Sequence, residues 1–375
     1  MKYNTVKLGE YLYIKGRIGW KGLKKSEYLE HSEYRIINGE ALTEDGINWD
    51  KAGFITKERY DESPEIMLKE EDILISKDGT IGKIGFINKL EQPTTVASGI
   101  FVIRNLQPEI INTRFIYNFL CSHYFKAFIT MRTEGSVIPH LYQKDFVDLD
   151  FPLPQKETQE KIVSILDGIS AQIDINKKIN EKLEEQAKAI FKSWFIDFEP
   201  FEGKVPLNWE NGVLGDFVKI KRGGSPRPIS QFLSTSGLHW LKISDATCTN
   251  SPFINKIKEY IIEDGLKKTV FLKSGNLVLS NSATPGLPKI LDIDTCIHDG
   301  WLYFPQSRFS NEYLYLYFTL IRNNLVSLGN GSVFTNLKTD ILKNYPTYLP
   351  TNDILNKFDN IIKPIFSIIL TKQEK

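Results

Sequence analysis

The chain repeats one of its own segments. The letters "TEGSVIPHL" at 133–141 are answered by "GNGSVFTNL" at 329–337, so that G-S-V and a final leucine recur 196 positions later. Three earlier matches run in the same order: "LGEYLYIKGR" (8–17) with "LGDFVKIKRG" (214–223), "DILIS" (72–76) with "NLVLS" (276–280), and "RFIYNFL" (114–120) with "EYLYLYF" (312–318). Their offset falls only from 206 to 196, which chance matches between short apolar strings would not produce. The sequence therefore predicts a duplicated domain.

Each copy begins with β-strand signals and continues with helical ones. "EDILIS" and "GIFVIR" read as short strands bounded by turn residues, and "GNLVLS" and "GWLYF" answer them in the second copy. Between the first two strands, "DGTIGKIG" (78–85) lacks the spacing of a nucleotide-binding loop, so we expect a tight strand-to-strand turn. Aromatic-rich helical stretches follow at about 112–130 and 310–328. The expected fold class is α+β, with two duplicated β-rich α/β domains.

A different kind of sequence separates the two copies. From Glu157 to Trp194 the only glycine is Gly168, and there is no proline. A sustained four–three spacing of seam positions predicts a long coiled-coil helix. These positions hold Ile162, Leu166, Ile169, Ile173, Asn176, Asn180, Leu183, Ala187, Ile190 and Trp194. The two asparagines are either buried, where they would fix register and partner, or turned towards solvent.

The C-terminal tail begins the same helix again. Carrying the offset of 196 forward maps the first four seam positions onto Phe358, Ile362, Ile365 and Ile369. Pro364 is expected to bend this second helix, because proline removes a backbone donor. Two helices that each follow one copy of the same domain can pack antiparallel. The expected organisation is a first domain at 1–154, a central helix at 155–198, a second domain at 199–350 and a short distal helix at 351–375.

Composition narrows the class of protein. Hydrophobic residues are 41% and charged residues 25%, as in soluble globular proteins, and the net charge of +1 argues against a uniformly basic surface. No run of eighteen apolar residues occurs, and the start "MKYNTVKLGE" has no apolar signal core, so we expect a cytoplasmic protein. Three cysteines without paired spacing and five scattered histidines favour reduced structural thiols over a disulfide framework or a zinc site.

Motifs of catalysis are missing from the sequence. There is no GxGxxG or GxxxxGK[ST] pattern, no Asn-Pro-Pro-aromatic run of an adenine methyltransferase, and no Pro-Asp start with an ExK strand of a nuclease. The sequence therefore favours a chain without its own active site, and we expect it to bind no metal or cofactor. An enzyme with an unrecognised site is the alternative.

Basic, glycine-rich segments recur at matching positions. Residues 15–25 read "KGRIGWKGLKK" and residues 219–228 read "KIKRGGSPRP", both without an acidic residue. Positive charge with glycine suits close contact with phosphates, although an ordinary solvated loop has the same composition. The GSV segments and the residues after the matching strands add short polar groups, which either contact DNA or cap strand ends. The candidate DNA contacts are Arg17, Trp20, Lys21, Lys24, Lys25, Lys77, Thr80, Lys83, Ser136, His140, Lys221, Arg222, Ser225, Arg227, Asn281, Thr284, Ser332 and Asn336.

The central segment resembles a known family. "FPLPQKETQEKIVSILDGISAQIDINKKINEKLEEQAKAIFKSWFIDFEPF" (151–201) is similar to the central region of specificity subunits of type I restriction–modification enzymes, with its P-L-P entry, "NKKIN" centre and "FKSWF" exit. The first copy, with "GWKGL" and "KDGTIGKIG", resembles one variety of target recognition domain, and the second copy resembles another. The distal helix is shorter than is usual in the family.

The resemblance implies a function and partners. Each domain would read one half of a bipartite site in double-stranded DNA. The helices would set the gap and dock two methyltransferase subunits, which use S-adenosylmethionine to methylate adenine N6. Restriction subunits, with ATP and Mg, would cut unmodified DNA. The docking residues would be the seam residues of both helices. A scaffold or inhibitor that keeps this architecture without reading DNA is the alternative.

Overall fold

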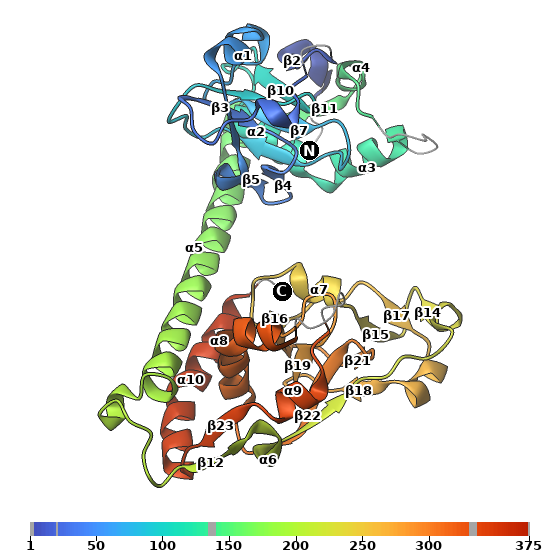
Figure 1. Ribbon diagram of the computed structural model, residues 1–375. Helices are drawn as coiled ribbons and strands as arrows, with labels where there is room; N and C mark the ends of the chain where they lie inside the picture. The colour runs from blue at the N-terminus through green and yellow to red at the C-terminus, as the bar shows by residue number, and fades with distance from the viewer. Residues whose placement is uncertain (1–3, 20–21, 134–139, 330–335, 374–375) are drawn as a thin grey trace. The chain divides into compact units, whose positions relative to one another are not determined.

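The computed structural model describes residues 4–19, 22–133, 140–329 and 336–373 (Figure 1). It divides into two compact units, 1–171 and 172–375, so the boundary falls inside one long helix. Each unit contains one copy of the repeat. The first domain is the globular part of the first unit, and the second domain is the globular part of the second unit.

The first domain is built on a four-stranded antiparallel sheet. Its strand order is β2 (Leu12–Gly16), β10 (Ile100–Asn105), β7 (Ile73–Ser76), β8 (Ile84–Phe86). The second sheet has the order β6 (Gly53–Ile55), β3 (Tyr34–Ile37), β9 (Thr94–Val96). Two short pairs complete the domain: β1 (Asn4–Lys7) with β11 (Asp150–Leu153), and β4 (Leu42–Thr43) with β5 (Gly46–Ile47).

The second domain enlarges the same plan. Its first sheet has the order β13 (Val218–Arg222), β22 (Trp301–Ser307), β19 (Leu277–Ser280), β20 (Pro288–Leu291), β16 (Phe253–Ile254). Its second sheet has the order β14 (Leu233–Ser234), β17 (Tyr260–Ile261), β15 (Leu238–Leu241), β21 (Thr295–Ile297), β18 (Val270–Leu272). The terminal pair is β12 (Glu210–Val213) with β23 (Pro346–Leu349).

The strand pairings confirm the duplication. The order β2-β10-β7-β8 returns as β13-β22-β19-β20, and the terminal pair β1–β11 returns as β12–β23. In the second sheet of each domain one parallel pairing is also repeated, β3 with β9 and β15 with β21. The strands expected from the sequence at "DILIS", "GIFVIR", "NLVLS" and "GWLYF" are all present, and "DGTIGKIG" does connect two neighbouring strands.

The central strands are apolar on both faces. Ile73 and Ile75 of β7 face one hydrophobic cluster, whereas Leu74 faces another, and all three side chains are fully or almost fully buried. In β19, Val278 likewise points away from the cluster that its neighbours join. Because successive side chains of a strand point to opposite faces, a strand covered on both sides reads as a continuous apolar run.

The helices follow the strands largely as expected. The first aromatic stretch forms two helices separated at Ser122, whose hydroxyl donates to the carbonyl of Phe119 (2.6 Å), whereas the second forms one continuous helix. The α-helices of the first domain are α1 (Lys57–Asp61), α2 (Thr113–Cys121), α3 (His123–Thr133) and α4 (Gln143–Val147). Those of the second are α6 (Leu214–Phe217), α7 (Ile243–Thr247), α8 (Asn311–Gly329) and α9 (Thr339–Lys343).

Two further helices pack antiparallel in the second unit. They are α5 (Lys156–Phe195) and α10 (Asn352–Lys372), which lie side by side in Figure 1. The ring of Phe358 lies 5.7 Å from that of Phe191 and 4.8 Å from that of Phe195 (centroid to centroid). Further along, the Asn180 amide donates to the carbonyl of Ile369 (3.1 Å). Residue numbers therefore rise along one helix as they fall along the other, which confirms the expected antiparallel pair.

The seam forms along only part of α5. Phe358, Ile362 and Ile369 are at most 1% exposed, and α10 continues through Pro364. In the first half of α5, however, Leu166 is 39% exposed and Ile169 54%. Their expected burial in a coiled-coil seam is therefore wrong, because α10 ends at the level of Asn176.

The other seam residues have separate partners. Ile162 packs at the edge of the first domain's core. Leu183 and Trp194 pack against the core of the second domain, as does Ile365. Ile173 is half-buried. Neither reading of the asparagine pair holds in full: both residues are half-buried, and they contact α10 through Ile369 and Lys372.

Candidate nucleic-acid interface

In the first domain a serine hydroxyl holds the loop that follows the central strand. The strand β7 ends at Ser76, and its hydroxyl donates to the carbonyl of Thr80 (2.6 Å). The same oxygen accepts a hydrogen bond from the backbone N–H of Lys83 (2.9 Å). Residues 77–83, the first strand-end loop, are thereby closed across their base, which fixes their backbone.

The second domain repeats this device at equivalent positions. The hydroxyl of Ser280 donates to the carbonyl of Thr284 and accepts from the N–H of Leu287 (2.9 Å). Residues 281–287 form the second strand-end loop. The two domains therefore share individual hydrogen bonds at this place, and not only similar sequences.

Backbone conformation also repeats in the two loops. Gly79 has φ of +67° and its counterpart Ala283 has φ of +57°, while Gly82 and Gly286 have φ of +86° and +73°. A left-handed φ costs an alanine about 1 kcal/mol that glycine does not incur. Backbone strain of this kind is concentrated at functional sites, so Ala283 marks the second loop as a candidate.

The GSV segments return to the strand-end loops. The N–H of Leu141 donates to the carbonyl of Lys77 (3.1 Å), and the N–H of Leu337 donates to the carbonyl of Asn281 (2.8 Å). Both leucine side chains are buried, so each return is anchored in its core. Residues 134–139 and 330–335, which include the predicted contacts Ser136 and Ser332, lie outside the described residues.

Polar side chains of the first domain gather where these segments meet. The Nδ1 atom of His140 forms a hydrogen bond with the carboxylate of Asp78 in the first strand-end loop. The ring of Tyr142 lies 4.5 Å from the His140 ring, centroid to centroid. The Lys77 ammonium lies 4.9 Å from the centroid of the Phe101 ring. A histidine, a lysine and an acid therefore surround the end of one strand.

In the second domain the equivalent gathering centres on Asp299. Its carboxylate accepts from the hydroxyl of Ser225 (2.6 Å) and pairs with Arg227 (3.4 Å). Its backbone carbonyl accepts from Arg222 and from the Asn281 amide (3.3 Å). The hydrogen bond from Ser225 lowers the pKa of Asp299 below its usual value, so the group is a carboxylate at neutral pH. Four residues predicted to contact DNA are thus brought together, but Asn281 is only 3% exposed, so the prediction that its side chain contacts DNA is contradicted.

Sequence comparison of the copies could not have found Asp299. Ile100 pairs with Ser76 in the first domain, and Trp301 pairs with Ser280 in the second. Asp299 therefore has the position in the second domain that Ser98 has in the first. Because the two side chains differ, no repeated letter points to the position. Only the fold shows that it joins the segment after β13 to the second strand-end loop.

Arg17 is not a surface residue. The side chain is 2% exposed, and its guanidinium donates to the carbonyl of Val96 (3.1 Å) and to the hydroxyl of Ser63 (3.4 Å). The prediction that Arg17 contacts DNA is therefore contradicted, because its donors serve the interior. Burial, with a smaller contribution from Arg59, lowers the pKa of Arg17. Its charge alone could not reveal this role, since an arginine in a basic segment is usually exposed.

The other basic residues are divided between strand and loop. Lys221 and Arg222 lie in β13, so the predicted loop begins only at Gly223. Lys24 and Lys25 are exposed at the start of a short 3₁₀ turn, while Lys83 is half-buried and its ammonium contacts the carbonyl of Gly39 (3.4 Å).

Three further residues predicted to contact DNA reach the surface to different extents. Thr80 and Asn336 are exposed and Thr284 is half-buried. Trp20 and Lys21 lie outside the described residues.

The described part of the chain has no cluster of side chains that could bind a metal ion. Across the described ranges, no three His, Cys, Asp or Glu side chains are grouped so as to hold a metal ion. Cys121, Cys248 and Cys296 are free thiols. None of the helices among the described residues is long and apolar enough to cross a membrane.

Comparison with known proteins identifies the family. The model of the type I restriction modification DNA specificity domain matches residues 2–185 and again residues 206–375. The chain belongs to this family. Each match covers one copy of the repeat together with helical sequence next to it, so the duplicated architecture is that of a specificity subunit.

Individual specificity subunits are similar over most of their length. The type I restriction enzyme MjaIX specificity subunit of Methanocaldococcus jannaschii is 25% identical over 337 residues, covering 83% of this chain and 76% of that protein. The MjaVIII specificity subunit of the same organism is also 25% identical, covering 100% of this chain and 88% of that protein. A crystal structure of a type I system S subunit from M. genitalium has the same fold, with a TM-score of 0.54 at 13% identity, covering 99% and 91% of the two chains.

Proposed function

We propose that this chain supplies sequence recognition to a type I restriction–modification complex, with each domain reading one half of a bipartite site in double-stranded DNA. The observation that carries the proposal is the repeated strand-end loop. The hydrogen bonds from its serine hydroxyl to the loop backbone are the same in both domains, whereas the polar groups around it differ: His140 with Asp78 in one, and the cluster around Asp299 in the other. A common frame with different side chains suits two readers of different sequences.

The helices would set the gap between the half-sites and dock two modification subunits. In support, Leu166 and Ile169 leave an apolar stripe exposed on the first half of α5, where a partner helix could pack. The proposed partners are two methyltransferase subunits, which would use S-adenosylmethionine to methylate adenine N6. Restriction subunits would add ATP- and Mg-dependent cleavage. This chain would act in the cytoplasm, bind no cofactor and carry out no catalytic step.

The proposal is tested with the full chain, with and without its modification subunits. We expect the chain alone to transfer no methyl groups, and the assembled complex to methylate one bipartite sequence. DNA affinity of the complex should fall steeply with salt and should depend on sequence, measured by titration against competitor DNA at two salt concentrations.

Two results would contradict the proposal. Methyl transfer by the purified chain alone would show that it is an enzyme. The second result would be that the assembled complex binds all DNA sequences equally well and that methylation does not depend on this chain. The chain would then be a scaffold or an inhibitor.

A further inference from the structure

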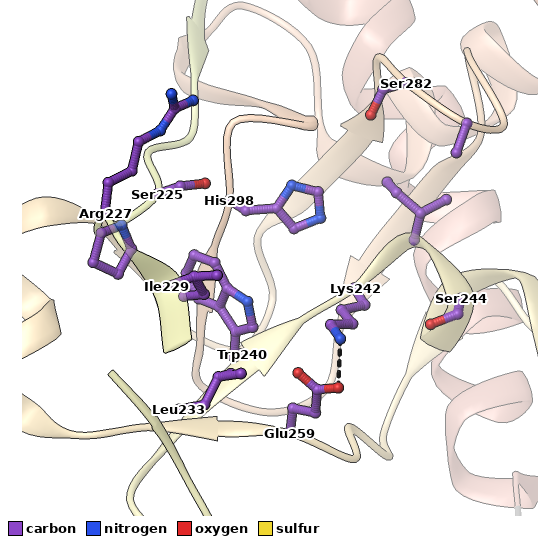
Figure 2. A pocket seen from close by; sticks show the side chains of 13 residues that line it. Ser225, Arg227, Ile229, Leu233, Trp240, Lys242, Ser244, Glu259, Ser282 and His298 are labelled. Atoms are coloured by element: carbon purple, nitrogen blue, oxygen red, sulfur yellow. Dashed lines mark hydrogen bonds and ion pairs between the residues drawn. The ribbon is translucent and has the colours of Figure 1, made fainter. Parts of the chain in front are cut away.

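The second domain contains a pocket beside the cluster around Asp299. Its volume is about 680 Å³, and its wall includes Ser225 and Arg227 on one side and Ser282 of the second strand-end loop on the other (Figure 2). These residues flank or belong to segments already predicted to contact DNA. The pocket therefore adjoins segments that are predicted to contact DNA.

The interior of the pocket carries polar groups that the sequence did not single out. Figure 2 shows Lys242, Glu259 and His298 facing the same space, next to the ring of Trp240. These residues come from three separate stretches of the chain, which is why no motif joins them. Ile229, Leu233 and Ile243 supply apolar surface around them.

Lys242 and Glu259 together offer a donor and an acceptor. The ammonium of Lys242 pairs with one oxygen of Glu259, and among the described residues the other oxygen of Glu259 has no hydrogen-bond partner. An ammonium has three N–H donors, so this contact leaves two of them available. The second oxygen of Glu259 is buried from solvent, but the oxygen that pairs with Lys242 has another lone pair, and Glu259 lines the pocket, so this pairing oxygen can accept from an incoming amino group.

His298 adds a second donor of defined orientation. Its Nδ1 accepts a hydrogen bond from the N–H of Gly300 (2.8 Å), so in the neutral ring the proton is on Nε2. Burial is the main reason why the pKa of His298 is lowered, and Lys242 and Arg222 lower it further while Asp299 opposes them. The ring is thus a neutral donor at pH 7.

The equivalent positions in the first domain carry different chemistry. In the first domain Ile37 pairs with Val96, and at the equivalent place in the second domain Leu241 pairs with Ile297. The residues that follow are Asn38 and Ala97 in the first domain, and Lys242 and His298 in the second. The strand pairing is therefore the same, while the hydrogen-bond donors and acceptors differ. That is the difference expected between positions that read different sequences.

We propose that this pocket is where the second domain reads base identity, and that Lys242 and Glu259 are its specificity-determining pair. The major-groove edge of a base pair sets an acceptor next to an amino group, as N7 and N6 of adenine do. The ammonium would donate to the acceptor, and the Glu259 oxygen that pairs with Lys242 would accept from the amino group through its other lone pair. Arg227 at the rim would contact phosphate. The inference rests on the proposed function and names residues within it.

Exchanging the two charges tests this directly. The variant Lys242→Glu with Glu259→Lys keeps an ion pair but reverses the donor and the acceptor. The full chain is expressed with its modification subunits, and methylated sites are mapped across the genome of the host. We expect the half-site read by the second domain to change at one base pair, with preference for the original base falling about tenfold or more. The other half-site should stay the same and serves as the internal control.

Two further variants separate reading from folding and from phosphate contact. Glu259→Gln keeps the shape but turns part of an acceptor into a donor, so it should relax the same base pair. Because the pair is partly exposed, its loss should change stability little, as thermal unfolding would show. Arg227→Ala should lower methylation at all sites without changing their sequence.

Each outcome bears on a different claim. Unchanged half-sites and rate in both the exchanged and the Glu259→Gln variants would overturn the assignment of Lys242 and Glu259, while the proposed function stood. A change in both half-sites at once would also overturn it, because the effect would be global. A wild-type complex without any sequence preference would instead reject the proposed function, and the inference with it.

Discussion

Lys372 donates to the side-chain oxygen of Asn176 (3.2 Å), and these two residues are equivalent positions of the repeat, 196 apart. In an antiparallel pair of equivalent helices, equivalent residues meet only at the local two-fold axis. The axis of the α5–α10 pair therefore passes close to this contact.

The spacer can be lengthened where α10 does not pack. An insertion after Glu181 would move Phe191 out of register with Phe358, whereas one after Ser170 leaves every α5–α10 contact in place. Seven inserted residues add about 10.5 Å of helix and rotate it by only about 20°. We expect the gap between methylated half-sites to grow by about three base pairs, at about 3.4 Å each, with both half-sites unchanged. Sequencing of methylated sites checks this, and an altered half-site would argue against a ruler.

Asn180 is expected to lower the stability of the α5–α10 helix pair. Its amide nitrogen donates to Ile369, but among the described residues its buried side-chain oxygen has no partner. Replacing a polar seam residue by an apolar one removes that cost, so Asn180→Leu should raise the free energy of unfolding by about 1 kcal/mol in a denaturant titration. Leu183→Ala, one turn away, should instead lower it by about 2 kcal/mol. A loss of stability in Asn180→Leu would show that the hydrogen bond outweighs the unpaired oxygen.

The two strand-end loops make a matched pair for backbone strain. Ala283→Gly should stabilise the protein by about 1 kcal/mol, because glycine adopts a positive φ without the steric cost of a Cβ. Gly79→Ala, at the equivalent position, should destabilise it by a similar amount, and no described atom stands within 4 Å of the added methyl group to complicate the comparison. Thermal unfolding of both variants gives the test. Equal signs for the two changes would disprove the strain.

Lys289 predicts a specific dependence of stability on pH. The residue is 3% exposed, and burial lowers its pKa from 10.5 to about 8, against a smaller opposing effect of Glu184. Below pH 8 the folded protein bears the full cost of a buried ammonium, and this cost disappears as the pH rises towards 10.5. The stability of the wild type relative to Lys289→Met should therefore increase by about 3 kcal/mol between those values.

Denaturant unfolding at several pH values measures this difference. Tyrosines with raised pKa values destabilise both proteins alike at high pH, so their effect cancels in the comparison. A stability difference that stays constant from about pH 7.5 to about pH 10.5 would show that Lys289 is not held in a desolvated site.

Lys24 and Lys25 test the interaction with phosphates. Both are exposed, so alanine substitutions should not disturb the fold. The double variant should weaken DNA binding of the complex at every sequence, and the slope of log affinity against log salt should fall by about 0.9 for each phosphate that is no longer neutralised. The Arg17→Ala variant should act differently: it should lower thermal stability, because the guanidinium is buried and hydrogen-bonded. An unchanged salt slope in the double variant would place that segment outside the interface.

The sequence alone was enough to predict the repeat, the strands around "DILIS" and "NLVLS", the long helix and its antiparallel pairing with the distal helix. These predictions rest on periodicity and offset, which are properties of the chain itself. They did not separate Arg17 from Lys24, since both are basic residues of one segment and only packing buries the first. Nor did they place Lys242, Glu259 and His298 together. Those three lie up to 56 positions apart, and the pairings of β15 with β17 and β21 bring them round one pocket. Contacts between residues far apart in the chain depend on how the sheets are folded over each other, and that is decided by the tertiary structure.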